Sequence, residues 1–373
     1  MRVALSGWFW ERPETGSGQY LRRLAATLAR QESDLAVTLY LPGRAAPADL
    51  PPGIPAVVLP ALPGPLGKVV WEQLSLPRAL RHQGADSLHV PYWGSPWRVI
   101  APVVVTVHDL IPLLLPAYHS SALVRLYTAL VSATARRAAM ILTDSESARG
   151  DIVRHLRVPE ARVRAVLLAA DAEYHPEGSL TPLEVLGLTP GYVLYLGGFD
   201  SRKNLATVFA ALALVRQEIP DMRLVVAGRL PAQDSAFAPD PRRLMREAGL
   251  PEPAVIFTGF IPEAAKPALY RGARAFIFLS RYEGFGLPPL EALACGTPVV
   301  ASASSSLPEV VGEGGVLVAP DDTAGAAAAL ARLLRDDAYH GELRTRALRQ
   351  AARFSWERTA AETTAAYREV VEC

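Results

Sequence analysis

The sequence alternates short, continuously apolar runs with longer amphipathic stretches along almost all of its 373 residues. Short apolar runs are typical of strands buried on both faces, and the stretches between them have helical spacing. This alternation predicts the α/β class, with parallel sheets covered by helices. The expected strands are residues 2–5, 36–40, 87–90, 103–107, 140–143 and 163–167, then 192–196, 223–227, 255–258, 275–280, 299–301 and 315–318.

A segment rich in proline and glycine, residues 175–191, separates these two sets of strands. The chain is also longer than a single hydrophobic core usually supports. We therefore expect two doubly wound, Rossmann-like domains, residues 1–173 and 174–355. In such sheets ligands bind beyond the carboxyl ends of the strands, which favours a site in a cleft between the domains.

The composition excludes several classes of protein. A net charge of +1 gives no sign of nucleic-acid binding. The two cysteines, Cys295 and Cys373, cannot form a disulfide framework, so we expect a cytoplasmic protein, at most peripheral to the inner face of a membrane. Only three of the 38 basic residues are lysine, namely Lys68, Lys203 and Lys266, so a lysine here indicates a specific role.

Two motifs in the first half each allow two interpretations. Gly16-Ser17-Gly18 opens a helix after the first strand, where its backbone N–H groups could meet an anion. It lacks the third glycine and the acid of a dinucleotide fingerprint, and a flexible turn explains it equally well. His108 and Asp109 end an apolar strand and could bind a substrate hydroxyl, or could simply be satisfied within a turn.

Two motifs in the second half point more strongly to a ligand. Arg202 and Lys203 follow a glycine turn and lead into a helix, which favours diphosphate binding. Glu283 and Glu291 flank Gly284-Phe285-Gly286, where carboxylates and backbone N–H groups could hold hydroxyls. A hydrolytic carboxylate pair is the rival interpretation, but it leaves Lys203 unexplained. We expect no metal site, because the sequence contains no Asp-x-Asp and no paired cysteines.

In combination these segments resemble the family 4 retaining glycosyltransferases of the GT-B fold, which have two Rossmann-like domains facing across a cleft. The shared motifs are Glu-x7-Glu from Glu283 to Glu291, Gly-Gly-x-x-x-Arg-Lys-Asn, Val-His-Asp-Leu and Thr-Gly-x-Gly-x-Tyr. The resemblance extends over residues 3–320, and residues 356–373 resemble the helix that returns to the first domain in this family.

The resemblance implies a role for each matching residue. Lys203 and Arg202 would bind the donor diphosphate, Glu291 the ribose, and Glu283 the donor sugar, which His108 would contact from the opposite domain. Residues 16–18 would form the loop that closes on the phosphates. The expected catalytic residues are His108, Glu283, Lys203 and Arg202, and the donor-binding residues are Gly16, Ser17, Gly18, Gly198, Arg229, Gly284, Phe285, Gly286, Leu287 and Glu291.

One departure from the family pattern bears on the donor. Gly198 stands where many members have an arginine, so Arg202 or Arg229 would have to supply the second cation. This variant resembles the subgroup that transfers mannosyl groups, which suggests GDP-mannose as donor and a saccharide or lipid-linked saccharide as acceptor. The family also implies retention of configuration, with no cofactor and no required metal.

Aromatic residues near the ends of the first and third expected strands, residues 2–5 and 87–90, suggest an acceptor site, since aromatic faces stack on sugar rings. The candidates are Trp8, Trp10, Tyr92 and Trp93, together with Asp109; the alternative for each ring is ordinary packing. Two other functions stay open, a sugar-nucleotide epimerase on the same scaffold and a non-catalytic subunit that binds nucleotide sugars. The sequence leaves the oligomeric state open.

Overall fold

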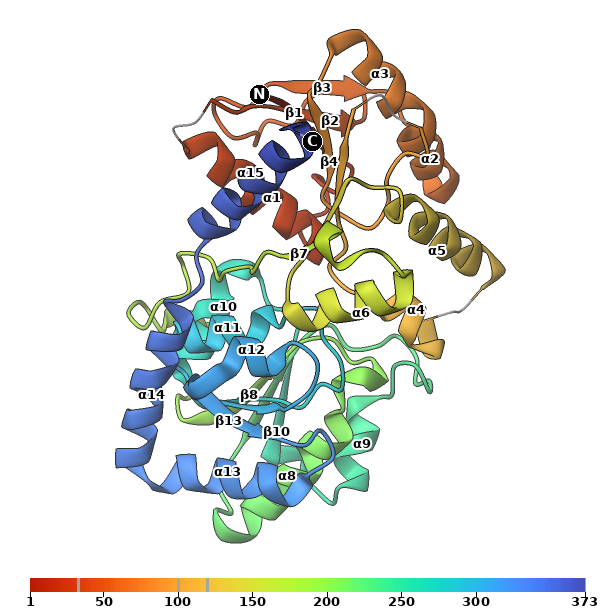
Figure 1. Cartoon of the computed structure of the whole chain (residues 1–373). Coiled ribbons are helices and arrows are strands. Elements are labelled where there is room, and N and C mark those ends of the chain that lie inside the picture. Colours follow the sequence, from red (N-terminus) through yellow and green to blue (C-terminus); the bar gives the residue numbers. More distant parts are fainter. Residues whose placement is uncertain (32–33, 99–100, 119–120, 373) are drawn as a thin grey trace. The chain divides into compact units, whose positions relative to one another are not determined.

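The structure is a computed structural model that describes residues 1–31, 34–98, 101–118 and 121–372 (Figure 1). The chain divides into two compact units, unit 1 with Met1–Leu168 and Trp356–Cys373, and unit 2 with Ala169–Ser355. The predicted division, after residue 173, falls in the loop that follows strand β7 (Val163–Ala165). Each unit contains one sheet in which every described pairing is parallel, so the α/β class predicted from the sequence is confirmed.

Unit 1 is built on a seven-stranded sheet with the order β3-β2-β1-β4-β5-β6-β7. The order reverses between β1 and β4, and such a switch point is where open α/β sheets bind ligands. The sequence analysis missed β3, a partly exposed edge strand of four residues. The strands are β1 (Arg2–Ser6), β2 (Ala36–Pro42), β3 (Ala56–Leu59), β4 (Ser87–Val90), β5 (Val103–Thr106), β6 (Met140–Thr143) and β7 (Val163–Ala165).

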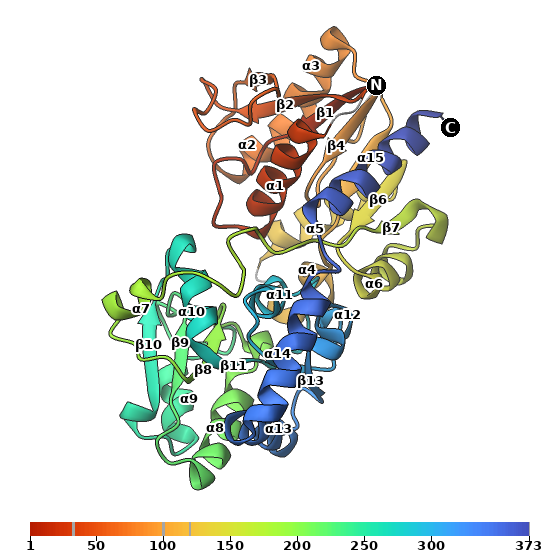
Figure 2. The ribbon, with the colours of Figure 1, turned by 90° about the vertical axis from the view of Figure 1, so that its left-hand side faces the viewer.

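Helix α15 (Trp356–Glu372) at the carboxyl end of the chain packs beside α1 (Gly16–Arg30) in unit 1 (Figure 2). Tyr367 of α15 is fully buried, and its hydroxyl lies 2.6 Å from Nδ1 of His89 on β4. Burial lowers the pKa of His89 to about 3, so this histidine is neutral. The other helices of unit 1 are α2 (Gly64–Val70), α3 (Leu76–Gln83), α4 (Ile111–Leu114), α5 (Ala122–Ala135) and α6 (Glu146–Leu156).

Unit 2 has a six-stranded sheet with the order β10-β9-β8-β11-β12-β13, and its switch point lies between β8 and β11. Strands β8 and β9 are apolar throughout and fully buried, as their composition predicts. With these, every strand expected from the sequence is present. The strands are β8 (Tyr192–Leu196), β9 (Leu224–Ala227), β10 (Val255–Gly259), β11 (Ala273–Phe278), β12 (Val299–Ser302) and β13 (Gly315–Val318).

The helices of unit 2 connect successive strands and cover the sheet. Among them, α11 begins one residue after Gly286 and ends before Gly296, as proline and glycine at its two ends predict. They are α7 (Thr181–Val185), α8 (Leu205–Glu218), α9 (Pro241–Glu247), α10 (Lys266–Gly272), α11 (Leu287–Ala294), α12 (Leu307–Val311), α13 (Thr323–Arg335) and α14 (Asp337–Ala351). In the described part of the chain, no helix has both the length and the apolar character needed to cross a membrane.

Candidate functional site

The loop after β8 carries the two adjacent cations. It ends in a 3-10 turn, Ser201–Lys203, followed by Asn204 in the left-handed conformation with φ 58°. Asparagine tolerates this conformation better than most residues. The Asn204 side chain is buried and donates from Nδ2 to the carbonyl oxygen of Pro320 at 2.7 Å. Asn204 therefore fixes the turn that presents Arg202 and Lys203.

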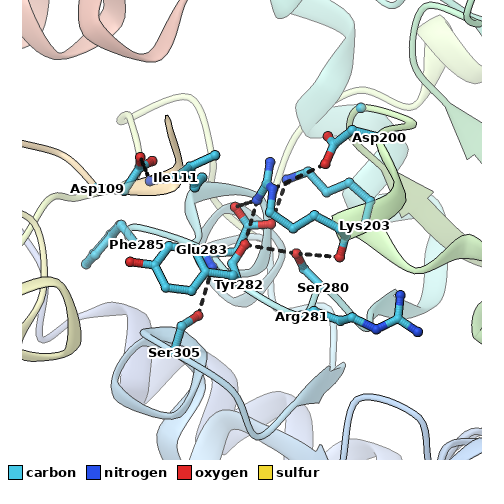
Figure 3. A network of polar contacts seen from close by, with 12 residues as sticks. Asp109, Ile111, Asp200, Lys203, Ser280, Arg281, Tyr282, Glu283, Phe285 and Ser305 are labelled. Carbon is cyan, nitrogen blue, oxygen red and sulfur yellow. Dashed lines mark hydrogen bonds and ion pairs between the residues drawn. The ribbon is translucent and has the colours of Figure 1, made fainter. Parts of the chain in front are cut away.

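Both cations contact Glu283, which lies in the loop after β11 (Figure 3). Lys203 Nζ donates to Glu283 Oε1 at 2.6 Å, and Arg202 Nη1 lies 2.8 Å from Oε2. Arg202 also donates to the carbonyl oxygen of Tyr282 at 2.6 Å and lies 3.2 Å from Asp200. The three charged side chains of the central pairs are only 11–12% exposed, so water screens them weakly.

Glu283 is held ionised by this arrangement. Burial by itself would raise the pKa of its carboxyl, but Lys203 and Arg202 outweigh that effect and lower the pKa below its ordinary value. A carboxylate with a lowered pKa is a hydrogen-bond acceptor and a poor general acid near neutral pH. The geometry thus suits Glu283 to accepting hydrogen bonds from hydroxyl groups.

A serine-rich loop after β12 fixes the backbone around Glu283. The backbone N–H of Glu283 donates to Ser305 Oγ at 2.8 Å, and Ser306 Oγ donates to the carbonyl oxygen of Glu283 at 3.0 Å. Ser305 has a φ of 48°, an uncommon conformation for serine. Sequence reasoning missed these serines, although the run of three from Ser304 to Ser306 was a visible signal.

The glycine segment that follows Glu283 requires glycine at one position. Gly286 has a φ of 117°, and a Cβ added there would lie 2.8 Å from Cδ2 of Leu307. Gly284 is buried, and Phe285 packs edge-on against Phe354 with ring centroids 5.9 Å apart. Leu287 is the first residue of α11, so this segment delivers the chain directly into that helix.

Glu291 lies on α11 in a different environment. Its Oε2 accepts a hydrogen bond from the hydroxyl of the fully buried Tyr270 at 2.8 Å. Burial raises the pKa of Glu291 to about 7, and the nearby Lys266 only partly offsets that effect. The local sequence does not distinguish the two acids in this way, because the difference between their pKa values comes from tertiary neighbours. Within the described residues no hydrogen bond joins Glu291 to Glu283.

Arg229 follows β9 and is exposed to solvent. Its guanidinium lies 5.5 Å from the ring centroid of Phe260, and it forms no ion pair within the described residues. A Cβ added to the neighbouring Gly228 would lie 2.2 Å from the carbonyl oxygen of Gly197. The loops after β8 and β9 therefore touch, which puts the backbone of Arg229 next to the Gly197-Gly198 turn.

In unit 1, His108 follows β5 and pairs with Asp144 at the end of β6. His108 Nδ1 lies 2.8 Å from Asp144 Oδ2, and the Tyr20 ring packs edge-on against the imidazole at 5.0 Å. Burial lowers the pKa of His108, but the Asp144 carboxylate reverses this and leaves the pKa raised. Nε2 of His108 is buried and has no hydrogen-bond partner in the described part of the chain. Sequence reasoning did not identify Asp144.

The glycine motif at the start of α1 has a structural function at one of its positions. Thr15 caps the helix by accepting a hydrogen bond from the Gly18 N–H at 3.1 Å. A Cβ on Gly18 would lie 2.0 Å from the carbonyl oxygen of Arg12, so the close backbone approach requires glycine. Gly16 has open space around it and Ser17 is partly exposed, which leaves these two residues accessible.

The four aromatic acceptor candidates differ in how exposed they are to solvent. Trp10 and Tyr92 are each only 2% exposed, and Trp10 Nε1 donates to Asp49 at 3.1 Å. In the structure the rings of Trp10 and Tyr92 are packed in the core of unit 1, which agrees with the alternative interpretation of ordinary packing. Trp8 and Trp93 are partly exposed.

Asp109, the remaining acceptor candidate, receives a hydrogen bond from the backbone N–H of Ile111 at 2.9 Å, also drawn in Figure 3. This contact helps to start the short helix α4. Among the residues that the structure describes, no three His, Cys, Asp or Glu side chains are grouped so that they could hold a metal ion.

Comparison with known proteins agrees with the motifs. The family model described as Glycosyltransferase Family 4 matches residues 15–174, and the model described as Glycosyl transferases group 1 matches residues 183–354. The chain is 35% identical over 296 residues to the O-antigen chain mannosyltransferase B of Escherichia coli, covering 78% of this chain and 76% of that protein.

Two further similarities support the same assignment. The serotype-specific mannosyltransferase WbdA of Escherichia coli is 31% identical over 287 residues, which cover 75% of this chain but 34% of WbdA. The solved structure of sucrose-phosphate synthase from Thermosynechococcus elongatus is 25% identical, with a TM-score of 0.78 over 99% of both chains. With its two parallel sheets and the Glu-x7-Glu segment in place, the chain belongs to the family 4 glycosyltransferases and has their GT-B fold.

Proposed function

We propose that this glycosyltransferase moves a mannosyl group from GDP-mannose to a hydroxyl of a saccharide or lipid-linked saccharide, with retention of configuration and without a metal ion. The mannosyl donor is supported by the two relatives named as mannosyltransferases. The single observation that carries the proposal is the ion-pair network of Lys203, Arg202 and Glu283. It brings two cations and a hydrogen-bond acceptor together at the carboxyl end of the unit 2 sheet.

The cations match the charge that develops in the reaction. When the bond from the anomeric carbon to the phosphate oxygen breaks, the leaving nucleoside diphosphate gains negative charge. Lys203 has an ammonium with N–H groups beyond the one given to Glu283. Arg202 is already occupied by Glu283, Asp200 and a carbonyl oxygen, whereas Arg229 is exposed beside the Gly197-Gly198 turn. We therefore assign to Arg229 the role of the missing arginine.

The two acids would hold opposite ends of one donor. Glu283, ionised and close to buried backbone, accepts from hydroxyls of the sugar, and Glu291 accepts from the ribose hydroxyls. His108 would bind a sugar hydroxyl through Nε2. The acceptor oxygen attacks the anomeric carbon on the face that the phosphate leaves, and its proton passes to the departing phosphate oxygen.

Incubation of the full chain with single nucleotide sugars in the presence of EDTA tests this proposal. GDP-mannose is expected to raise the melting temperature most and to be hydrolysed slowly without acceptor. NMR of the transfer product is expected to show the anomeric configuration of the donor. A preference for a UDP-sugar would overturn the assignment of GDP-mannose as donor. A product of inverted configuration would overturn the proposed retention. A strict need for added divalent metal would overturn the charge-stabilising role given to the side chains.

The same experiment distinguishes the alternatives. A sugar-nucleotide epimerase would change the sugar of the donor with no acceptor present. A non-catalytic subunit would bind the donor and transfer nothing. We also propose a cytoplasmic location, peripheral to the membrane if the acceptor is lipid-linked; cell fractionation tests it, and recovery of the protein outside the cytoplasm would contradict it.

A further inference from the structure

Helices α2 and α3 and the π-helical turn between them, Trp71–Ser75, form one continuous helical segment of unit 1. Along this segment the large apolar side chains of Leu66, Val70 and Leu74 are exposed, by 73%, 38% and 47%. Residues four apart rotate slowly around an α-helix, whose turn has about 3.6 residues, and the wider π turn reverses part of this rotation. The three side chains therefore lie on one exposed face of the segment.

Helix α5 extends this apolar face. Leu123 and Leu126, near the start of the helix, are each 69% exposed. Lys68 Nζ on α2 donates to the hydroxyl of Tyr127 on α5 at 2.6 Å, which joins the two helices beside these leucines. Figure 1 shows α2, α3 and α5 on one side of the unit 1 sheet, with α1 and α15 on the other. The exposed apolar side chains of α2 and α5 thus belong to the same side of unit 1.

Two loops complete the apolar face. Leu62, before α2, is 63% exposed, and a Cβ added to Gly67 would lie 1.8 Å from its carbonyl oxygen, so this loop lies against the helix. Trp97, in the loop after β4, is 44% exposed, and its backbone N–H donates to Gln73 Oε1 in the π turn at 2.7 Å. Seven of the thirteen large apolar side chains exposed in the described part of the chain therefore belong to this face. Such a concentration is typical of an interaction surface.

The exposed charges on the same segments are of one sign. Within residues 62–83, 91–98 and 122–137 the only acid is Glu72, which is 1% exposed and paired with Lys68. The guanidinium of Arg137 lies 4.9 Å from the ring centroid of Trp97, at the border of the apolar face. An apolar face accompanied by cations suits a surface that is itself both apolar and anionic. The exposed arginines of these segments are Arg78, Arg81, Arg98, Arg125, Arg136 and Arg137.

We propose that this face of unit 1 binds the surface of a lipid bilayer that contains anionic lipids. The aliphatic side chains enter the boundary between headgroups and acyl chains, and Trp97 lies at the level of the headgroups. The arginines contact the lipid phosphates, which attract cations close to the bilayer surface. This inference deepens the membrane location given with the proposed function by naming the residues that would bind the bilayer. It does not depend on the identity of the donor sugar.

Two other occupants fit these observations less well. In a two-fold contact between copies of the chain, the same face would meet itself, and arginines would approach arginines with no exposed acid of these segments to pair them. The phosphate backbone of a nucleic acid would attract the arginines but offers no apolar surface to the leucines. An anionic bilayer matches both the apolar side chains and the charges.

Flotation of the full-length protein with lipid vesicles tests this surface. Vesicles of phosphatidylcholine and phosphatidylglycerol in equal amounts are expected to bind the protein, and vesicles of phosphatidylcholine alone to bind it only weakly. Leu66→Ser combined with Leu126→Ser is expected to weaken binding about tenfold, because two apolar side chains are lost from the interface. Arg78→Gln combined with Arg81→Gln is expected to weaken binding roughly thirtyfold at low salt, and much less at about 0.5 M NaCl.

Matched controls come from unit 2. Val185→Ser removes an apolar side chain that is 84% exposed, and Arg349→Gln removes an exposed arginine; both are expected to leave vesicle binding unchanged. All of the substituted side chains are exposed, so the melting temperatures of the variants should stay close to that of the wild type and show that they fold.

Three results would overturn the proposal. The first is a wild-type protein that does not bind the anionic vesicles, and the second is face variants that bind them as the controls do. The third is a dimer in size-exclusion chromatography that the leucine variant dissociates, because the face would then join two copies. GDP-mannose binding is measured in parallel. Its absence would count against the proposed donor, while vesicle binding would still decide the present inference.

Discussion

Glu283 and Lys203, eighty residues apart in the sequence, are joined by a hydrogen bond of 2.6 Å between charged atoms. Arg202 holds the second carboxylate oxygen at 2.8 Å, so one acid balances two neighbouring cations. If Lys203 binds a diphosphate, it must do so while sharing its charge with Glu283. The acid would then orient the cation as well as contact the sugar, which links donor binding to the integrity of this pair.

Glu283→Gln is expected to destabilise the protein, because it leaves two largely buried cations without their carboxylate. Breaking a buried pair in this way costs about 3 kcal/mol. Urea unfolding followed by fluorescence measures the change. Pyrophosphate is expected to stabilise the variant more than the wild type, since an anion can replace the lost charge. Equal stabilisation of both proteins, or a loss as small as that of Glu342→Gln in an exposed pair, would contradict this prediction.

The sheets were predictable because their strands are continuously apolar and buried on both faces. Tyr192–Leu196 illustrates this, since all five of its residues are buried. Ala56–Leu59 escaped because an edge strand is short, partly exposed and preceded by a proline-rich segment. The pattern of apolar residues in a sequence reflects burial, so a strand that is only partly buried is hard to predict from it.

The candidate site was predictable only in part. Lys203, Glu283 and Glu291 stand in motifs of fixed spacing, so local sequence revealed them. Asp144 gave no such signal, because its importance comes from a partner distant in the sequence, His108. Gly18 is the opposite case. Its motif resembled a ligand-binding loop, but the structure requires glycine there because the backbone approaches the Arg12 carbonyl closely.

Arg229→Ala is expected to weaken the binding of GDP about tenfold, because a charge-assisted contact to a diphosphate contributes about 1.5 kcal/mol. The melting temperature should stay within a degree or so of the wild type, since Arg229 is exposed and has no ion pair within the described residues. Isothermal titration calorimetry measures the affinity. Arg349→Ala, another exposed arginine of unit 2, is the control. Unchanged GDP binding in the Arg229 variant would remove this residue from the donor site.

Asp144→Asn is expected to lower the pKa of His108, because the lost carboxylate is what raises it against the effect of burial. The imidazole titration followed by NMR reads this directly and would show the proton released at a lower pH than in the wild type. Transfer activity is expected to fall at least tenfold, since the imidazole also loses the partner that orients Nδ1. Asp34→Asn, which breaks an exposed pair with Arg368, should leave the titration unchanged. A His108 pKa unmoved by Asp144→Asn would refute the coupling.

Glu291 makes stability depend on pH in a direction opposite to that of most carboxylates. Its pKa is about 7 in the folded chain and about 4.5 without burial, so between these values the folded state holds more protons than the unfolded state. The free energy of unfolding should therefore fall as pH rises from 4.5 to 7, by roughly 3 kcal/mol from this group, and then level off. Glu291→Gln should remove that contribution, so its stability relative to the wild type should increase from pH 5 to pH 8. Urea unfolding of both proteins at each pH measures the difference, with Glu342→Gln as the control. If the stability difference between the variant and the wild type does not vary with pH, Glu291 is ionised across this range. Donor binding through its carboxylate would then not depend on pH between pH 5 and pH 8.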